Sequence, residues 1–314
     1  MTTFADQVYQ LGGQPLGGLP VGVDGRVFYV DPSSTVGLAD PVGSDSNDGL
    51  SPSTALSTLQ AAIDKCDDWR GDLIICKAGN QTVTTAVTFD VKGLTVMAEP
   101  MGLPTDAAGE RFMIYGSHTD GPAAIISYPC KIIGMGFCGS EAAGGSLEID
   151  GETGGFDGGN FVHLLNCRFS HWGIAKAHAL ILQGTGDVRI ENCYFDGYTS
   201  GYTTSAIQCE LAGSSGSQVT DIVGCKFVNP TTYALKMKTS SVPVRGIVEG
   251  NRLIGSGLFF DDNDVDGSWG FYGNYFPTAT DTSTYADSVT NLKTAGYKFV
   301  TESAYVLVSV AVGK

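Results

Sequence analysis

The hexapeptide Ile190-Glu191-Asn192-Cys193-Tyr194-Phe195 has five counterparts in this chain of 314 residues. In all six, the first residue is large and apolar, the third is Asn or Gly, and the sixth is Phe or Leu. The fourth is Cys, Met or Asn, and charged or aromatic residues are common at the second and fifth positions. The counterparts are residues 132–137, 164–169, 222–227, 248–253 and 271–276. The chain therefore contains an internal repeat.

The repeat predicts the end of one strand, a one-residue bend and the start of a second strand. Asn and Gly are the residues that best tolerate the left-handed backbone of such a bend. Because alternate residues of a strand point to the same side, the fourth and sixth positions are expected to share a core. The second and fifth positions are expected to face water. A bent strand that repeats in this way is one coil of a solenoid.

The spacing of the repeats is uneven, as in solenoids whose loops vary in length. Their sixth residues are 137, 169, 195, 227, 253 and 276, so the separations are 32, 26, 32, 26 and 23 residues. Short apolar stretches without helical periodicity precede them. We expect one long domain of about eight or nine coils and roughly 40 Å in length at the usual spacing of strands.

Composition argues against several classes of function. The 33 acidic and 18 basic residues give a formal charge of −15, and no basic run is present, so we expect no nucleic-acid or anionic-membrane partner. No stretch approaches the ~18 consecutive apolar residues of a membrane span, and the first residues lack the features of a signal peptide. We therefore expect synthesis in a cytoplasm and no membrane insertion.

The eight cysteines are predicted to be reduced and structural. Three of them, Cys167, Cys193 and Cys225, recur at the inward fourth position of the repeat, and no CxxC pair indicates zinc or redox chemistry. The histidines show no ligand spacing and are interpreted as packing or surface residues; they are His118, His163, His171 and His178.

Four regions are expected along the chain. Residues 1–26 are rich in Gly and Pro and are interpreted as an extended anchoring arm, although a disordered tail is the alternative. Residues 27–70 hold an entry strand, a loop and a capping helix, and residues 71–278 form the solenoid. Residues 279–314 are a C-terminal β segment and a predicted oligomer contact. The apolar residues of the arm that would contact a partner are Leu11, Leu16, Leu19 and Val21.

The capping helix is predicted from Ser57 and Gln60, which have capping-box spacing, followed by one apolar face ending at Cys66. A short helix laid over the end of a solenoid covers its core and its open strand edges. In the preceding loop, Asp45, Asn47 and Asp48 are expected to hydrogen-bond their own backbone.

The segment GSDSNDGLSPSTALSTLQAAID, residues 43–64, resembles the entry segment of right-handed parallel β-helix proteins of the pectate-lyase-like superfamily. Proteins of tailed bacteriophages are among them. The resemblance, extended by the repeat over most of residues 70–278, implies an all-β fold, a right-handed parallel β-helix solenoid. It also implies a homotrimer, a location on the exposed surface of a virion, and contact with other virion proteins through the arm.

A calcium site is suggested by Asp262, Asp264 and Asp266, alternate carboxylates followed by Gly267 as in the first half of a calcium loop. The closing glutamate of an EF-hand is missing, because Gly273 stands at that position. A solvated acidic turn is the alternative. Ca²⁺ is the one cofactor that the sequence suggests.

The fifth position of the repeat is the predicted surface for a ligand or partner. Its residues are Arg168, Tyr194, Lys226, Arg252 and Tyr275. Aromatic rings and cations on an elongated surface suit sugars or protein partners. For catalysis, the candidates are the carboxylates Glu191, Asp196, Asp221 and Glu249, with Asp187 and Glu210 near loops, but none falls into a motif of paired acids. We therefore assign no catalytic residue and favour a protein that is not an enzyme.

Three functions compete on this evidence. The favoured one is a virion structural protein, a capsid decoration, head fibre or spike, that is anchored by the arm and binds host surface glycan. The alternative is a tailspike-like polysaccharide depolymerase or lyase. The third, a bacterial surface or adhesin module, is disfavoured because no export signal is recognised.

Overall fold

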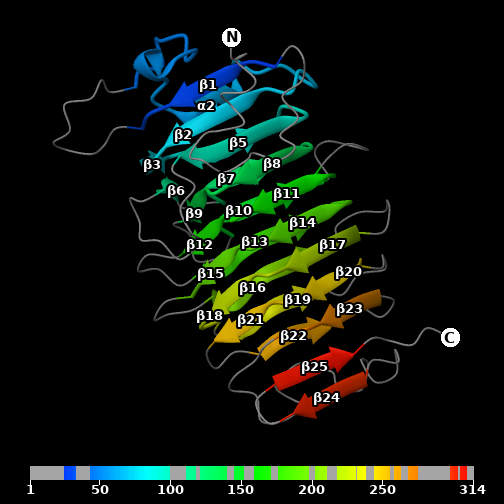
Figure 1. Cartoon of the computed structure of the whole chain (residues 1–314). Helices are drawn as coiled ribbons and strands as arrows, with labels where there is room; N and C mark the ends of the chain where they lie inside the picture. Colours follow the sequence, from blue (N-terminus) through cyan, green and yellow to red (C-terminus); the bar gives the residue numbers. More distant parts are fainter. Residues whose placement is uncertain are drawn as a thin grey trace, which may run out of the picture.

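The computed structural model is a parallel β-helix, in which the chain winds through three parallel sheets (Figure 1). The structure describes residues 25–32, 43–99, 111–117, 121–139, 145–151, 159–170, 176–197, 202–210, 218–230, 232–237, 244–254, 258–262, 268–274, 298–302 and 305–309. The anchoring arm and most of the residues after 274 lie outside these ranges.

Sheet A contains nine strands, and all of its strand pairs are parallel. Its first strand is the entry strand, and the others each begin a new coil. In spatial order the strands are β1 (Val27–Val30), β2 (Leu73–Lys77), β5 (Leu94–Glu99), β8 (Cys130–Ile133), β11 (Val162–Leu165), β14 (Val188–Glu191), β17 (Gln218–Val223), β20 (Val244–Glu249) and β23 (Ser268–Tyr272).

Sheets B and C contain seven strands each. Sheet B consists of β3 (Gly79–Val83), β6 (Phe112–Gly116), β9 (Gly136–Cys138), β12 (Arg168–Ser170), β15 (Tyr194–Asp196), β18 (Lys226–Val228) and β21 (Arg252–Ile254). Sheet C consists of β4 (Val87–Phe89), β7 (Ala124–Ile126), β10 (Leu147–Asp150), β13 (Lys176–Gln183), β16 (Tyr202–Glu210), β19 (Tyr233–Met237) and β22 (Leu258–Asp262). From β2 to β22 the chain visits A, B and C in turn, one strand in each.

The third position of the repeat is the bend between sheets A and B. Its backbone is left-handed in all six copies, with φ angles between 52° at Asn192 and 71° at Gly134. The other four are Asn166, Gly224, Gly250 and Gly273. The restriction of this position to Asn and Gly is therefore a backbone requirement, because other residues are strained there.

The inward positions of the repeat form continuous columns in the core. The rings of Phe137, Phe169, Phe195 and Phe227 stack, with centroids 5.6, 4.7 and 4.9 Å apart in successive coils. The first position is also buried wherever its side chain is described. Dispersion and the exclusion of water from these columns hold neighbouring coils together.

The fourth position changes its chemistry along the solenoid without leaving the core. Cys167, Cys193 and Cys225 are buried there, and all eight cysteines of the chain are free thiols, as expected. In the next two coils the position is taken by Asn251 and Asn274. Asn251 Oδ1 accepts from the backbone N–H of Cys225 (2.8 Å), and Asn274 Oδ1 accepts from the backbone N–H of Asn251 (3.0 Å). The buried side chains of Asn251 and Asn274 are therefore hydrogen-bonded.

The capping helix is α2 (Leu59–Ile63), which follows the 3₁₀ helix η2 (Pro52–Thr54). Leu59, Ala62 and Ile63 are fully buried and extend the core at the blue end of Figure 1. The prediction of a Ser57 cap was wrong, because the N-cap is Thr58, whose hydroxyl accepts from the amide of Ala61 (3.2 Å).

The loop before α2 explains why Thr58 is the cap. The Asp45 carboxylate accepts from the amides of Ser57 and Thr58, both at 2.9 Å, and thereby holds the start of the helix in place. Asn47 donates to the carbonyl of Ala55 (2.8 Å), and Asp48 accepts from the amide of Leu50 (3.0 Å). The predicted backbone bonding of these three residues is confirmed.

The opposite end of the solenoid is followed by a hairpin. β24 (Lys298–Glu302) and β25 (Tyr305–Ser309) pair antiparallel and lie beyond β23 (Figure 1). Both strands lie within the predicted C-terminal β segment, residues 279–314. Its role in an oligomer stays a prediction.

Candidate functional site

The first candidate site is a column of side chains on the outer face of sheet B, which we name the basic ladder. Arg168, Tyr194, Lys226 and Arg252 occupy equivalent positions on β12, β15, β18 and β21, in register from coil to coil. The structure thus brings together four of the five residues predicted at the fifth position. The fifth, Tyr275, lies outside the described residues.

Two cations flank the tyrosine of the basic ladder. The guanidinium carbon of Arg168 lies 5.3 Å from the centroid of the Tyr194 ring, and Lys226 Nζ lies 5.0 Å from it, within the range of cation–π attraction. Burial, with a smaller contribution from Asp196, raises the pKa of the Tyr194 phenol. The phenol is therefore a hydrogen-bond donor at neutral pH.

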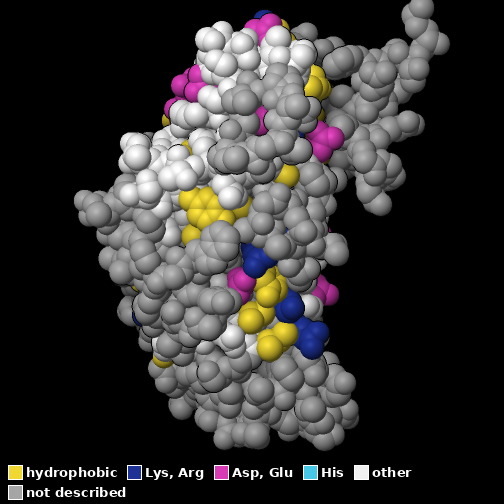
Figure 2. All heavy atoms as spheres, turned by 90° about the vertical axis from the view of Figure 1, so that its left-hand side faces the viewer, with side chains coloured by type: hydrophobic (Ala, Val, Ile, Leu, Met, Phe, Trp, Pro, Cys, Tyr) yellow, Lys and Arg dark blue, Asp and Glu magenta, His cyan; other side chains and the backbone are white. Residues whose placement is uncertain are grey.

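Asp196 is the acidic neighbour of the ladder. Its Oδ2 accepts from Arg168 NH2 at 2.7 Å, and both side chains are mostly buried. Because Asp196 is bound to an arginine, the structure does not offer it as one of a pair of catalytic acids. Among the described residues of β12, β15, β18 and β21, three cations stand beside one carboxylate, whereas the whole chain is acidic. Figure 2 shows Lys and Arg side chains gathered in the lower half of this face, beside hydrophobic and acidic ones.

The second candidate site lies on the outer face of sheet A, and we name it the charged cluster. Lys131, His163, Arg189 and Asp221 are in register on β8, β11, β14 and β17, with Glu191 two residues after Arg189. Arg189 Nε donates to Glu191 Oε2 at 2.9 Å, and Arg189 NH1 lies 3.7 Å from Asp221 Oδ2. One arginine is therefore paired with two of the predicted carboxylates.

His163 lies on the other side of Glu191. Its Nε2 is 3.3 Å from Glu191 Oε2, in a geometry outside that of a hydrogen bond. Burial is the main cause that lowers the pKa of His163, and the charge of Lys131 lowers it further, whereas Glu191 raises it. The imidazole is therefore neutral at pH 7 and able to accept a proton.

Glu191 of the cluster is not tuned as a proton donor. The hydrogen bond from Arg189 is the main cause that lowers the pKa of Glu191, so Glu191 is ionised at neutral pH. Glycoside hydrolysis by two carboxylates needs one of them protonated. The cluster offers a neutral base and two cations instead. Glu249, the remaining predicted carboxylate on this face, is exposed on β20.

The sequence reasoning missed Lys131, His163 and Arg189. Each directly precedes the first residue of a repeat, as Asp221 does, so an alignment longer by one residue would have placed all four in one column. His163 was interpreted as a packing or surface residue and is half-buried beside an ionised carboxylate.

The calcium prediction falls mostly outside the described residues. Asp262 is the last residue of β22, whereas Asp264 and Asp266 are not described, so calcium stays a prediction. Among the residues that are described, no group of three or more His, Cys, Asp or Glu could hold a metal ion. In the same part of the chain, no helix is long and apolar enough to cross a membrane.

Two of the solved structures to which the chain is similar are lyases. The chain is similar to the pectate lyase Pel9A, with 15% identity and a TM-score of 0.48, over 82% of this chain and 64% of that one. It thus spans less than two thirds of that lyase. It is also similar to a rhamnogalacturonan lyase, with 14% identity and a TM-score of 0.35, over 76% of each chain. No protein-family model and no curated protein sequence matches the chain.

Proposed function

We propose that this protein is a non-catalytic surface protein that binds an acidic glycan along the outer face of sheet B. The observation that carries the proposal is the basic ladder, with Tyr194 between Arg168 and Lys226. Its cations pair with carboxylate, sulfate or phosphate groups, and the tyrosine adds an amphipathic ring. The ladder is rigid because β12, β15 and β18 each pair with a strand on both sides and β21 pairs with β18.

The test is binding of polygalacturonate, an acidic polysaccharide, with dextran as the neutral probe. The double variant that carries Lys226→Gln and Arg252→Gln is expected to bind polygalacturonate at least tenfold more weakly. The dependence of its binding on salt is also expected to be smaller. Lys92→Gln is the matched control, because Lys92 lies 5.1 Å from the Tyr128 ring and its loss also removes a charge and a cation–π contact. Equal weakening by Lys92→Gln, or equal binding of dextran, would contradict the proposal.

The location that we propose for this protein is the exposed surface of a bacteriophage virion, as a capsid decoration, head fibre or spike. This part of the proposal rests on the resemblance of residues 43–64 to the entry segments of phage β-helix proteins. Mass spectrometry of purified particles tests it, and the chain is expected there in multiples of three. Absence of the chain from the particles would end the virion proposal without affecting glycan binding.

A second candidate function is a polysaccharide lyase that acts at the charged cluster. Elimination from a uronate needs a base for the proton and cations beside the carboxylate, and His163, Lys131 and Arg189 supply these groups on one face. Incubation with polygalacturonate, followed by the ultraviolet absorbance of unsaturated uronate, tests for this reaction. Activity that is lost in His163→Gln would favour the lyase, whereas an unchanged polymer would favour binding alone.

A further inference from the structure

A pocket of about 380 Å³ lies on the outer face of sheet A, at the end of the solenoid that carries the capping helix. Residues of β1, β2 and β5 line one part of it, and residues of η2 and the loop beside it line the other. Its volume is within the range of small-molecule sites in proteins. The pocket is separate from the basic ladder, which is on sheet B, and from the charged cluster, which lies farther along sheet A.

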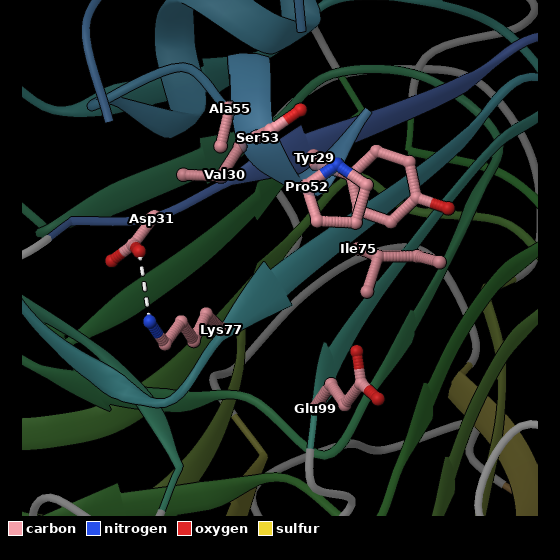
Figure 3. A pocket seen from close by; sticks show the side chains of 9 residues that line it. All are labelled: Tyr29, Val30, Asp31, Pro52, Ser53, Ala55, Ile75, Lys77 and Glu99. Carbon is pink, nitrogen blue, oxygen red and sulfur yellow. Dashed lines mark hydrogen bonds and ion pairs between the residues drawn. The ribbon is translucent and has the colours of Figure 1, made fainter. Parts of the chain in front are cut away.

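The apolar side of the pocket is formed by Tyr29, Ile75 and Pro52. Tyr29 and Ile75 are paired on β1 and β2, and they point away from the core because Phe28 and Val30, on either side of Tyr29, are buried in it. Pro52, the first residue of η2, lies beside the tyrosine ring (Figure 3). Tyr29 is only half-buried, so part of its ring is accessible from the pocket.

Three charged side chains form the polar border of the pocket. Lys77 Nζ lies 3.0 Å from Asp31 Oδ2, and Lys77 is paired with Glu99 between β2 and β5 (Figure 3). Burial and, to a smaller extent, the charge of Glu99 raise the pKa of Tyr29, so the phenol is protonated at neutral pH and can donate a hydrogen bond. Donors and acceptors of hydrogen bonds therefore stand beside an apolar wall.

The shape of the pocket is fixed by the loop that precedes the capping helix. The backbone N–H of Tyr29 donates to the carbonyl of Gly49 (2.8 Å), and the carbonyl of Tyr29 accepts from the N–H of Leu56 (2.9 Å). Within the loop, the hydroxyl of Ser51 accepts from the N–H of Thr54 (3.3 Å) and caps η2. Because both sides of the pocket are held by hydrogen bonds, a ligand would not have to order them on binding, which favours affinity.

The charges of the polar border favour a neutral ligand. An anion would meet the two carboxylates, and a cation would meet the ammonium group of Lys77. A neutral ring with several hydroxyl groups can donate to Asp31 and Glu99 and accept from Lys77. The same ring needs an apolar face that packs on the tyrosine. A pyranose sugar has both features, because its C–H groups lie on its faces and its hydroxyl groups lie at its rim.

We propose that the pocket binds a neutral pyranose, which packs a C–H face on Tyr29 and hydrogen-bonds through its hydroxyl groups to Asp31, Lys77 and Glu99. The proposal does not rest on the acidic-glycan binding assigned to the basic ladder. The two sites lie on different sheets and select ligands of different charge, so either one can be absent without the other.

The test is saturation-transfer NMR of the full chain with four neutral probes, the methyl glycosides of glucose, galactose, mannose and rhamnose. At least one of them is expected to bind with a Kd of about 10 mM or tighter. Glucuronate, a pyranose that carries a carboxylate, is expected to bind at least tenfold more weakly than the best neutral probe, since the pocket holds two carboxylates. Absence of binding by all four probes, or equal binding of glucuronate, would overturn the proposal.

Variants of Tyr29 separate the loss of binding from a loss of folding. Tyr29→Leu keeps apolar bulk on the outer face but lacks the flat ring, and it is expected to bind the best probe at least tenfold more weakly. Tyr29→Phe keeps the ring and is expected to retain affinity within about threefold. The matched control is Tyr128→Leu, because Tyr128 is also a half-buried tyrosine but does not line the pocket. Unchanged affinity in Tyr29→Leu, or equal weakening in Tyr128→Leu, would overturn the proposal.

Glu99→Ala tests the polar border without disturbing the core. The side chain of Glu99 is exposed, so its removal is expected to leave the thermal stability almost unchanged. Affinity for the best neutral probe is expected to fall several-fold, because the hydroxyl groups lose a charged acceptor. Unchanged affinity in this variant would contradict the proposed position of the sugar.

Discussion

The rings of Phe169 and Phe195 lie 4.7 Å apart between centroids, with their planes 4° from parallel. They belong to successive coils and have no exposed surface. In a solenoid each coil contacts only its neighbours, so such a pair contributes directly to the cohesion of the coils. The stack of four phenylalanines runs through the middle of sheet B, beneath the basic ladder.

Removal of one ring from this stack is expected to be strongly destabilising. Phe195→Ala should lower the free energy of unfolding by about 3 to 5 kcal/mol, because it leaves a cavity between two coils. Denaturant unfolding followed by circular dichroism measures the change. Phe161→Ala is the control, since Phe161 is 69% exposed, and it should change stability by less than ~0.5 kcal/mol. Similar losses for both variants would contradict the structural role of the stack.

The left-handed bends between sheets A and B predict that Ala and Asn differ in their effect on stability when they replace Gly250. Gly250 has φ of 63°, and an added Cβ would meet no atom closer than 4.0 Å. Gly250→Ala should therefore cost about 1 to 2 kcal/mol from the left-handed backbone alone. Gly250→Asn should cost less, because Asn occupies the equivalent bends at 166 and 192. Thermal unfolding of the two variants distinguishes this account from steric crowding, which would make the larger Asn the worse residue.

The Asp45 carboxylate predicts a loss of stability at acidic pH. Burial raises the pKa of Asp45, but the hydrogen bonds from Ser57 and Thr58 outweigh it and lower the pKa overall. A carboxylate with a lowered pKa stabilises the fold above its unfolded pKa of about 4, and the contribution is lost as the pH falls through the lower, folded value. Asp45→Ala should cost about 1 kcal/mol at neutral pH, since solvent partly screens the site. The difference from the unchanged protein should shrink as the pH falls below about 4, and a constant difference would contradict this assignment.

His163 predicts a second pH dependence with its own range. Its pKa is lowered in the fold, so the unfolded chain binds the proton more tightly. Its contribution to stability is complete above the unfolded pKa of about 6.5 and is lost as the pH falls from there through the lower, folded pKa. Between about pH 7.5 and pH 5.5, the protein should therefore lose more stability than His163→Gln does. Parallel curves of the free energy of unfolding against pH for the two proteins would show that His163 does not titrate in this way.

The solenoid could be predicted from the sequence because the bend and the core of each coil require particular residue types, and these recur at fixed positions of the repeat. The backbone of the bend requires Asn or Gly, and packing of the core favours Phe at the sixth position. Both requirements belong to single coils, so both are visible in the alternating pattern of a strand. The same alignment identified the basic ladder, since all of its members occupy one position of the repeat.

The charged cluster and the helix cap could not be identified in the same way. Arg189 and Asp221 lie 32 residues apart in sequence, and only the register of β14 with β17 shows that they are neighbours. At the cap, Ser57 and Thr58 have nearly the same chemistry, and the choice between them depends on Asp45, which is 13 residues away from Thr58. Contacts between distant residues decide both features, and the local pattern does not contain them.

The register of sheet B has a consequence for what the basic ladder can recognise. Arg168, Tyr194, Lys226 and Arg252 are spaced by the backbone hydrogen bonds between strands, about 4.8 Å per step. That interval cannot stretch or contract to suit a bound polymer. In the glycan binding that we propose, the ladder would therefore select chains whose negative groups recur at the spacing of the strands over chains with the same total charge at another interval.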